Sequence, residues 1–190
     1  MTIYFYLSLF LMLILSAVLI EKKKINLKRE LIYSFLAIIL ILISAFRWKV
    51  GGDWETYLVT YERSNLSLIT FQWSFIFEII NFIFSRLGTG IYGVNLFIAS
   101  TFFLALYRLG KILDLDIILL LLLSFSLIYF NGIFGYARQT LSLTLIIFSL
   151  EFIFRNKPKI SIMIYLLSIF THISSIIFIP IFTLLILNSK

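Results

Sequence analysis

One stretch of the sequence, from Arg47 to Tyr57, holds most of the residue types that could bind or move a charged group. Its letters read R-W-K-V-G-G-D-W-E-T-Y, and two glycines beside an aspartate permit a tight turn. The guanidinium of Arg47 can pair with phosphate or carboxylate oxygens. Asp53 could accept sugar hydroxyls or act as a general base. The other reading is a loop at the membrane surface with an aromatic belt of Trp48, Trp54 and Tyr57.

Two further polar points lie within apolar segments. Arg138 comes about one turn into an apolar stretch and is followed by Gln139. A lipid-facing arginine there would cost on the order of 3 kcal/mol, so Arg138 either faces the bundle or snorkels to the surface. His172, the only histidine, stands between Thr171 and a pair of serines in a long apolar run. A polar point at this depth predicts a functional site, and imidazole titrates near neutrality, as proton transfer requires.

Residue types and motifs exclude several other chemistries. The chain has no cysteine and one histidine, so the sequence predicts neither a disulfide nor a metal site. It contains no phosphate-binding loop, no dinucleotide fingerprint and no nucleophile elbow. We therefore expect no cofactor, and ATPases, dehydrogenases and serine hydrolases are not supported.

The elements that must position these residues are apolar helices. Of the 190 residues, 62% are hydrophobic and 13% charged, and the mean hydropathy is +1.08, which is typical of a protein whose solvent is lipid. The apolar segments are 3–20, 31–46, 91–107, 115–132, 134–150 and 160–187. The last is long for one span, so we expect two segments that meet at His172. The predicted fold is an all-α polytopic transmembrane bundle of about six to seven spans, in a single transmembrane domain over 1–190.

Segment 71–88 has a different pattern, which predicts an amphipathic helix in the membrane interface. Four polar residues are spaced to share one helical face: Ser74, Glu78, Asn81 and Ser85. Apolar residues form the other face: Trp73, Phe77, Ile80, Phe84 and Leu87.

The positions of the basic residues predict the orientation. The net charge of +7 comes from short clusters between apolar runs, which indicates membrane orientation and no nucleic-acid partner. If 71–88 does not span, ten basic residues face the cytoplasm and five face outward; if it spans, about six face inward and nine outward. The positive-inside rule therefore favours an interfacial 71–88, with the N-terminus outside and 3–20 as a retained helix. The outer side then holds Arg47, Asp53, Glu78, Arg138 and His172.

Three blocks in this order resemble the EpsG family of bacterial exopolysaccharide and capsule proteins, which are related to Wzy-type repeat-unit polymerases. The first block is similar to the family's R-x-x-V-G-x-D-x-x-x-Y pattern, matched at Arg47, Val50, Gly51, Asp53 and Tyr57. The second resembles its R-Q block at Arg138 and Gln139, and the third its histidine-then-serine block at His172 and Ser174. The family's proteins are longer, so we expect this chain to correspond to an N-terminal part that is incomplete at its C-terminus.

The resemblance implies a multi-pass protein of the bacterial inner membrane that polymerises glycan at the outer leaflet. Such a protein moves a glycan from an undecaprenyl diphosphate carrier to a lipid-linked repeat unit, with other polysaccharide-assembly proteins as possible partners. Arg47 and Arg138 would hold the diphosphate, Gln139 would also bind the substrate, and Asp53 or His172 would activate the acceptor hydroxyl. Tyr57 and Trp54 would stack on sugar. A close alternative is a transferase similar to O-antigen ligase. A non-catalytic transporter or assembly subunit is the alternative of another class, although the sequence lacks the paired repeats typical of transporters.

Overall fold

The computed structural model describes residues 8, 10–12, 14–15, 29–66 and 74–188. Most of the predicted segment 3–20, the basic cluster at 22–24 and Trp73 lie outside the described residues. Every regular element of the described residues is helical, which confirms the all-α fold class. In chain order the elements are α2 (Arg29–Ala45), α3 (Trp54–Leu66), α4 (Phe75–Arg86), α5 (Gly90–Ile112), α6 (Ile117–Ser124), the π-helix η1 (Phe125–Gly135), α7 (Ala137–Phe154), α8 (Pro158–Thr171), the 3-10 helix η2 (Ile173–Phe178) and α9 (Ile179–Asn188).

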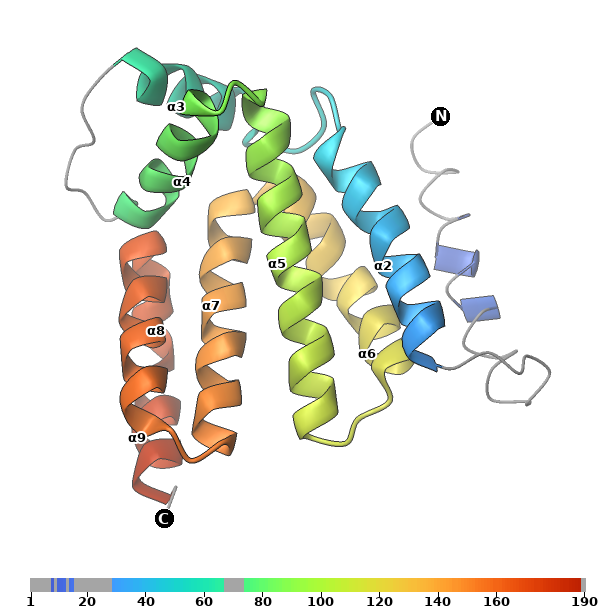
Figure 1. The fold of residues 1–190 in the computed structure, drawn as a ribbon, viewed down its shortest axis with the longest axis vertical. Helices are drawn as coiled ribbons and strands as arrows, with labels where there is room; N and C mark the ends of the chain where they lie inside the picture. The colour runs from blue at the N-terminus through green and yellow to red at the C-terminus, as the bar shows by residue number, and fades with distance from the viewer. Residues whose placement is uncertain (1–7, 9, 13, 16–28, 67–73, 189–190) are drawn as a thin grey trace.

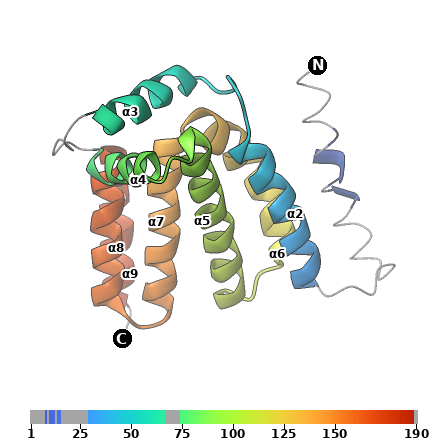
Figure 2. The ribbon, with the colours of Figure 1, turned by 45° about the horizontal axis from the view of Figure 1, so that its top comes forward.

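The longer helices run alongside one another and form a bundle (Figure 1). Helices α5 and α7 are long and apolar enough to cross a membrane, and α8 and the segment Ile173–Leu187 are shorter apolar helices. The predicted number of spans, six to seven, stays a prediction. Helices α3 and α4 instead lie across one end of the bundle (Figure 2). We call this the capped end, and the opposite end, where α5 joins α6 and α7 joins α8, the turn end.

Large aromatic side chains and small residues fill the centre of the bundle. Phe102, Phe103 and Tyr129 are almost completely buried between α2, α5 and η1. The Tyr129 hydroxyl donates to the Leu40 carbonyl oxygen at 2.8 Å, which satisfies its polar atom within the apolar core. Gly110 allows α5 to approach α6, since a Cβ at this position would lie 3.0 Å from a methyl carbon of Ile117.

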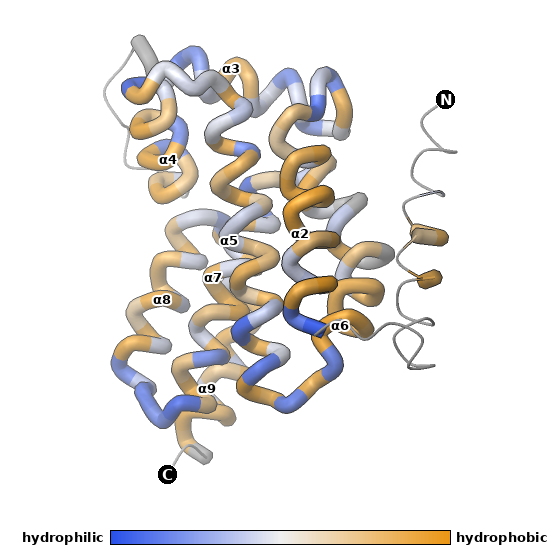
Figure 3. The backbone as a smooth tube through the Cα atoms, turned by 45° about the vertical axis from the view of Figure 1, so that its right-hand side comes forward, coloured by the Kyte–Doolittle hydropathy of each residue, from blue (hydrophilic) through white to orange (hydrophobic). Residues whose placement is uncertain are grey.

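Charged residues gather at the two ends, and the middle of the bundle is mostly apolar (Figure 3). The predicted outer group lies together at the capped end, where α2 ends, α7 begins and α8 ends (Figures 1 and 2). At the turn end, Lys111 pairs with Glu30 at 2.6 Å and Arg29 pairs with Asp116. Asp116 also caps α6 by accepting from the backbone N–H groups of residues 118 and 119. Which end faces outward stays a prediction.

Helix α4 corresponds to the predicted amphipathic segment 71–88 but differs from it in one respect. Asn81, placed on the polar face by its spacing, is fully buried, and its Nδ2 donates to the Phe77 carbonyl oxygen at 2.7 Å. Phe77 is also buried, so the inward face of α4 includes both residues because positions four apart share a face. The expectation of a wholly polar outer stripe was wrong at Asn81. Ser74 and Glu78 of the same stripe are only half-buried and hydrogen-bonded to each other at 2.8 Å.

The long apolar run 160–187 divides at His172, as predicted. Residue His172 has an extended backbone (φ −157°, ψ 119°), and the chain reverses there from α8 into η2 and α9. Stacking of Tyr165 on Phe182, with ring centroids 4.2 Å apart, fastens α9 against α8.

Candidate functional site

The loop from Arg47 to Asp53 is fixed against the end of η1 by Gly51. Gly51 has φ +110°, and a Cβ at this position would lie 1.7 Å from the Phe134 carbonyl oxygen, so only glycine fits. Around a Cβ at the neighbouring Gly52 there is nothing within 4 Å. The sequence pattern that resembles the EpsG family fixes the first of these glycines and leaves the second variable. The structure gives the physical reason for that difference.

Arg47 lies inside the protein and holds the same loop to η1 and α5. It is 5% exposed, and its Nη1 donates to the Ile133 carbonyl oxygen at 2.5 Å. Its Nη2 donates to Asn95 Oδ1 on α5 at 3.3 Å. The guanidinium also lies 5.6 Å from the ring centroids of Trp54 and Phe134. The Arg47 side chain therefore joins three segments that are distant in the sequence.

The aromatic residues of the loop are mostly buried. Trp54 and Tyr57 are 2% and 6% exposed, whereas Trp48 is 56% exposed and packs edge-on against Trp54. An aromatic belt facing lipid or water would need all three rings at the surface, so that reading was wrong for Trp54 and Tyr57. Because neither buried ring presents an open face, we assign both residues supporting roles in the proposal below.

Tyr57 connects the first sequence block to the second. Its hydroxyl donates to Asp53 Oδ2 at 3.3 Å and accepts from the backbone N–H of Arg138 at 3.5 Å. Burial, opposed by Arg138 and aided by Asp53, raises the pKa of Tyr57 to about 12. The phenol therefore stays neutral and keeps its proton for the Asp53 carboxylate.

The Arg138 side chain is half-buried at the start of α7. Among the described residues no hydrogen bond or ion pair reaches this side chain, and its buried Nε has no partner. The two carboxylates that could have neutralised it have other partners: Asp53 accepts from Tyr57, and Glu78 accepts from Ser74 at 2.8 Å. Arg138 therefore has its guanidinium available to an anion from outside the described chain.

His172 brings the third block to the same end of the bundle. Its half-buried imidazole lies in the turn between α8 and η2, and burial first, then the positive charge of Arg138, lowers the pKa of His172. The imidazole is thus mainly neutral near pH 7 and able to accept a proton.

Hydrogen bonds between α7, α8 and η2 fix the position of this turn. Ser142 on α7 donates to the Ser168 carbonyl oxygen at 2.9 Å and shares a short hydrogen bond with Ser175. The Tyr165 hydroxyl donates to the Ser175 carbonyl oxygen at 2.6 Å. The turn that carries His172 is therefore held directly to α7, whose first turn contains Arg138.

The structure brings together Asp53, Tyr57, Arg138 and His172. Arg47 and Trp54, from the same loop as Asp53, are buried beside each other. Gln139 and Ser174 are exposed, and their side chains make no hydrogen bond with another described residue. Sequence reasoning missed Asn95, which is 5% exposed in α5 and accepts from Arg47. The sequence feature that could have indicated Asn95 is a polar amide side chain within an apolar helix. Within the described residues no three His, Asp or Glu side chains gather as metal ligands.

A cation, a neutral imidazole, a carboxylate and a phenol at one end of an apolar bundle can bind an anionic group and transfer a proton. In comparisons with known proteins, the model of the EpsG family matches residues 30–190. Comparison with curated proteins and with solved structures gave no match.

Proposed function

The chain belongs to the EpsG family, and on that premise we propose that it is a membrane glycan polymerase of the Wzy type, or part of one. Its substrate would be an oligosaccharide linked to undecaprenyl diphosphate, used in the synthesis of capsule, exopolysaccharide or O-antigen. The site would face outward from the bacterial inner membrane in a multi-pass protein whose N-terminus is also outside. The ten-to-five distribution of basic residues supports this orientation.

The observation that carries the proposal is Arg138. A half-buried guanidinium without a carboxylate partner among the described residues is costly, and an anionic ligand would offset that cost. A diphosphate at the end of an apolar bundle is such a ligand, because its polyprenyl chain lies in the membrane. Arginine pairs with phosphate oxygens through two parallel hydrogen bonds.

The reaction would proceed by displacement at the anomeric carbon of the donor sugar. The acceptor hydroxyl oxygen forms the new glycosidic bond, the bond between the anomeric carbon and the diphosphate oxygen breaks, and the diphosphate leaves with the electron pair. Arg138 would stabilise the negative charge that grows on this leaving group. His172, neutral and close to Arg138, would take the hydroxyl proton.

The remaining residues of the site would position Arg138 and His172. The Asp53 carboxylate holds the Tyr57 hydroxyl, which in turn accepts from the Arg138 backbone and fixes the first turn of α7. Arg47 and Trp54 would hold the loop in place. Trp48, with 56% of its surface exposed, is an exposed aromatic residue of the loop and would contact a sugar ring.

Binding of undecaprenyl diphosphate to the purified protein in detergent micelles tests the central step. Arg138→Lys keeps the charge but removes the fork, so the dissociation constant should rise about tenfold. The matched control is Arg86→Lys, since Arg86 is an exposed arginine at the same end whose guanidinium lies 5.0 Å from the Phe82 ring. Unchanged binding by Arg138→Lys and Arg138→Gln, or equal losses in the control, would reject the proposal.

Glycan chain length separates catalysis from mere binding. In the host strain, with protein amounts checked, His172→Ala should leave short glycans and accumulated lipid-linked repeat units. Asp53→Asn should have a smaller effect if Asp53 only orients Tyr57, and an equally large one if Asp53 is the base. Normal polymer from both variants, with intact diphosphate binding, would favour a non-catalytic carrier or assembly subunit.

A further inference from the structure

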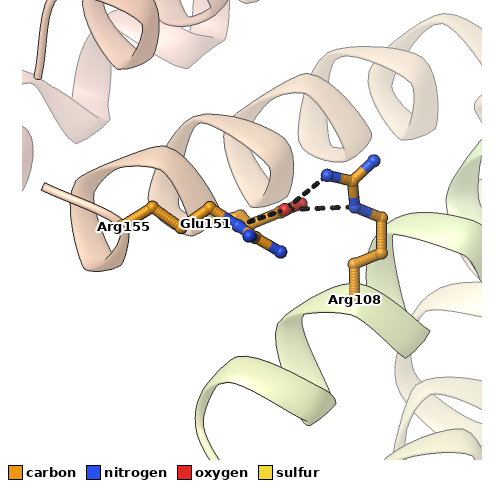
Figure 4. A network of polar contacts seen from close by, with 3 residues as sticks. All are labelled: Arg108, Glu151 and Arg155. Carbon is orange, nitrogen blue, oxygen red and sulfur yellow. Dashed lines mark hydrogen bonds and ion pairs between the residues drawn. The ribbon is translucent and has the colours of Figure 1, made fainter. Parts of the chain in front are cut away.

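The turn end of the bundle carries a second group of charges that the proposed function does not use. Glu151, near the end of α7, is fully buried, and its Oε1 accepts three hydrogen bonds. Arg108 donates two of them, through Nε at 3.1 Å and Nη2 at 2.6 Å, and Arg155 donates one through Nε at 2.9 Å (Figure 4). One carboxylate therefore fixes two guanidinium groups from two helices.

Both guanidinium groups keep donors that Glu151 does not use. The side chains of Arg108 and Arg155 are 39% and 47% exposed. Within the described part of the chain, Nη1 of Arg108 and both terminal nitrogens of Arg155 have no hydrogen-bond partner, and Figure 4 shows the unbonded nitrogen of Arg108 directed away from Glu151. Fixed guanidinium groups lose little conformational freedom when an anion binds between them.

The surface around Arg155 at the turn end is strongly positive. Lys157, in the turn between α7 and α8, and Lys159, in the first turn of α8, follow Arg155, and both are exposed. The chain contains no acidic residue after Glu151. Among the described residues, the other acids at this end are Glu30 and Asp116, which are already paired, and Asp114, which interacts with Lys111. Together with Glu151, the four cations Arg108, Arg155, Lys157 and Lys159 thus carry a net charge of +3.

An apolar surface begins directly beside this turn. Ile160, Met163 and Leu167 are 41%, 67% and 42% exposed, and their spacing of three and four residues puts them on one face of α8. A ligand that suits this combination has an anionic phosphate at the turn and hydrocarbon along the helix. A free phosphate ion would use only the first half of the surface.

We propose that Arg108 and Arg155, held by Glu151, bind the phosphate of an anionic phospholipid whose acyl chains lie along the exposed face of α8. This site is at the opposite end of the bundle from Arg138 and does not depend on glycan chemistry. In the orientation proposed above it lies in the cytoplasmic leaflet, where juxtamembrane basic residues meet anionic lipids.

Lipid retention by the purified protein tests the site. The full chain would be equilibrated in mixed micelles with phosphatidylglycerol or phosphatidylcholine, and bound lipid measured by native mass spectrometry. We expect clear preference for phosphatidylglycerol and about fivefold weaker retention of it in Arg155→Gln, the effect of losing one basic contact near the surface. Arg29→Gln is the control, because Arg29 is 53% exposed at the same end and pairs with a single carboxylate.

Three results would overturn the proposal: equal retention of the two lipids, equal losses in Arg155→Gln and Arg29→Gln, or displacement of the lipid by millimolar inorganic phosphate. The last would assign the site to a free anion. If Arg155→Gln does not fold, as judged by gel filtration, Arg155→Lys decides, since lysine keeps a positive charge beside Glu151 but lacks the two terminal guanidinium nitrogens that the proposal assigns to the phosphate. Unchanged retention in that variant would then count against the proposal.

Discussion

Replacing Gly51 by alanine should unfold the site loop from η1, whereas the same change at Gly52 should be tolerated. At Gly51 the new methyl carbon would lie 1.7 Å from the Phe134 carbonyl oxygen and 2.8 Å from its carbon. Contacts below 3.0 Å are essentially never seen for Cβ atoms, so the backbone must move by more than an ångström. The positive φ of +110° adds strain that alanine cannot relieve in place.

The two penalties set the size of the effect. An unfavourable backbone conformation costs about 1–3 kcal/mol, and forcing a methyl group into a packed site costs about the same again. We therefore expect Gly51→Ala to lose about 4 kcal/mol of stability, or roughly 8–16 °C in the midpoint of thermal unfolding for a chain of this size. Gly52→Ala should lie within about 1 kcal/mol of the original protein.

Thermal unfolding followed by circular dichroism in detergent measures both variants side by side. Diphosphate binding should fall in Gly51→Ala and persist in Gly52→Ala, because the loop carries Asp53 and orders the residues around Arg138. Equal midpoints for the two variants would refute the packing of Gly51 against Phe134. A large loss in Gly52→Ala alone would show that the loop has another conformation.

Three other perturbations test further parts of the structure. Arg108→Ala should lower the free energy of unfolding by about 2 kcal/mol and Arg155→Ala by about half of that. The reason is that Arg108 supplies two of the three hydrogen bonds to buried Glu151, while both arginines are partly solvated. A lower thermal midpoint for Arg155→Ala than for Arg108→Ala would contradict the network. Tyr57→Phe should cost about 1 kcal/mol and shorten the glycan at normal protein levels, because it removes both hydrogen bonds of the Tyr57 hydroxyl. Tyr61→Phe loses one 3.4 Å hydrogen bond to the Phe84 carbonyl oxygen, outside the site, and should leave glycan length unchanged. Equal glycan lengths from both variants would remove Tyr57 from the site. Because the chain has a single histidine, NMR can follow the titration of the His172 imidazole without overlap. The pKa of His172 should lie below the ordinary 6.5 and should rise in Arg138→Gln, because a neighbouring positive charge is lost. An unchanged pKa in this variant would show that Arg138 does not lie close to His172.

Much of the architecture followed from hydropathy alone. Apolar runs predicted the helices because a membrane protein hides its backbone polar groups in helices. The break at His172 was predictable because a polar point interrupted a run too long for one span. The three sequence blocks also lie at the same end of the bundle. This follows because successive helices alternate in direction, and α4 lies across the end of the bundle without reversing that order.

The remaining details depend on packing that a linear pattern does not record. Asn81 fits the polar stripe of α4 by its spacing, yet α3, α5 and α8 cover α4 and bury this residue. Glu151 directly follows the apolar segment 134–150, and only its approach to Arg108 on α5 makes it the centre of a network. The burial of Arg47 was equally hidden, because its partners Asn95 and Ile133 are 48 and 86 residues away in sequence.

The attachment of Arg47 to the Ile133 carbonyl also constrains how the protein is made. The two residues are 86 positions apart, and ribosomes add about 5–20 residues per second, so roughly 4–17 s pass between the synthesis of the arginine and of its acceptor. During that interval the buried position of Arg47 does not yet exist, and its guanidinium must remain solvated at the membrane surface. The loop is therefore completed late, when η1 arrives, and any delay in inserting α5 or α6 prolongs the period in which proteases can reach it.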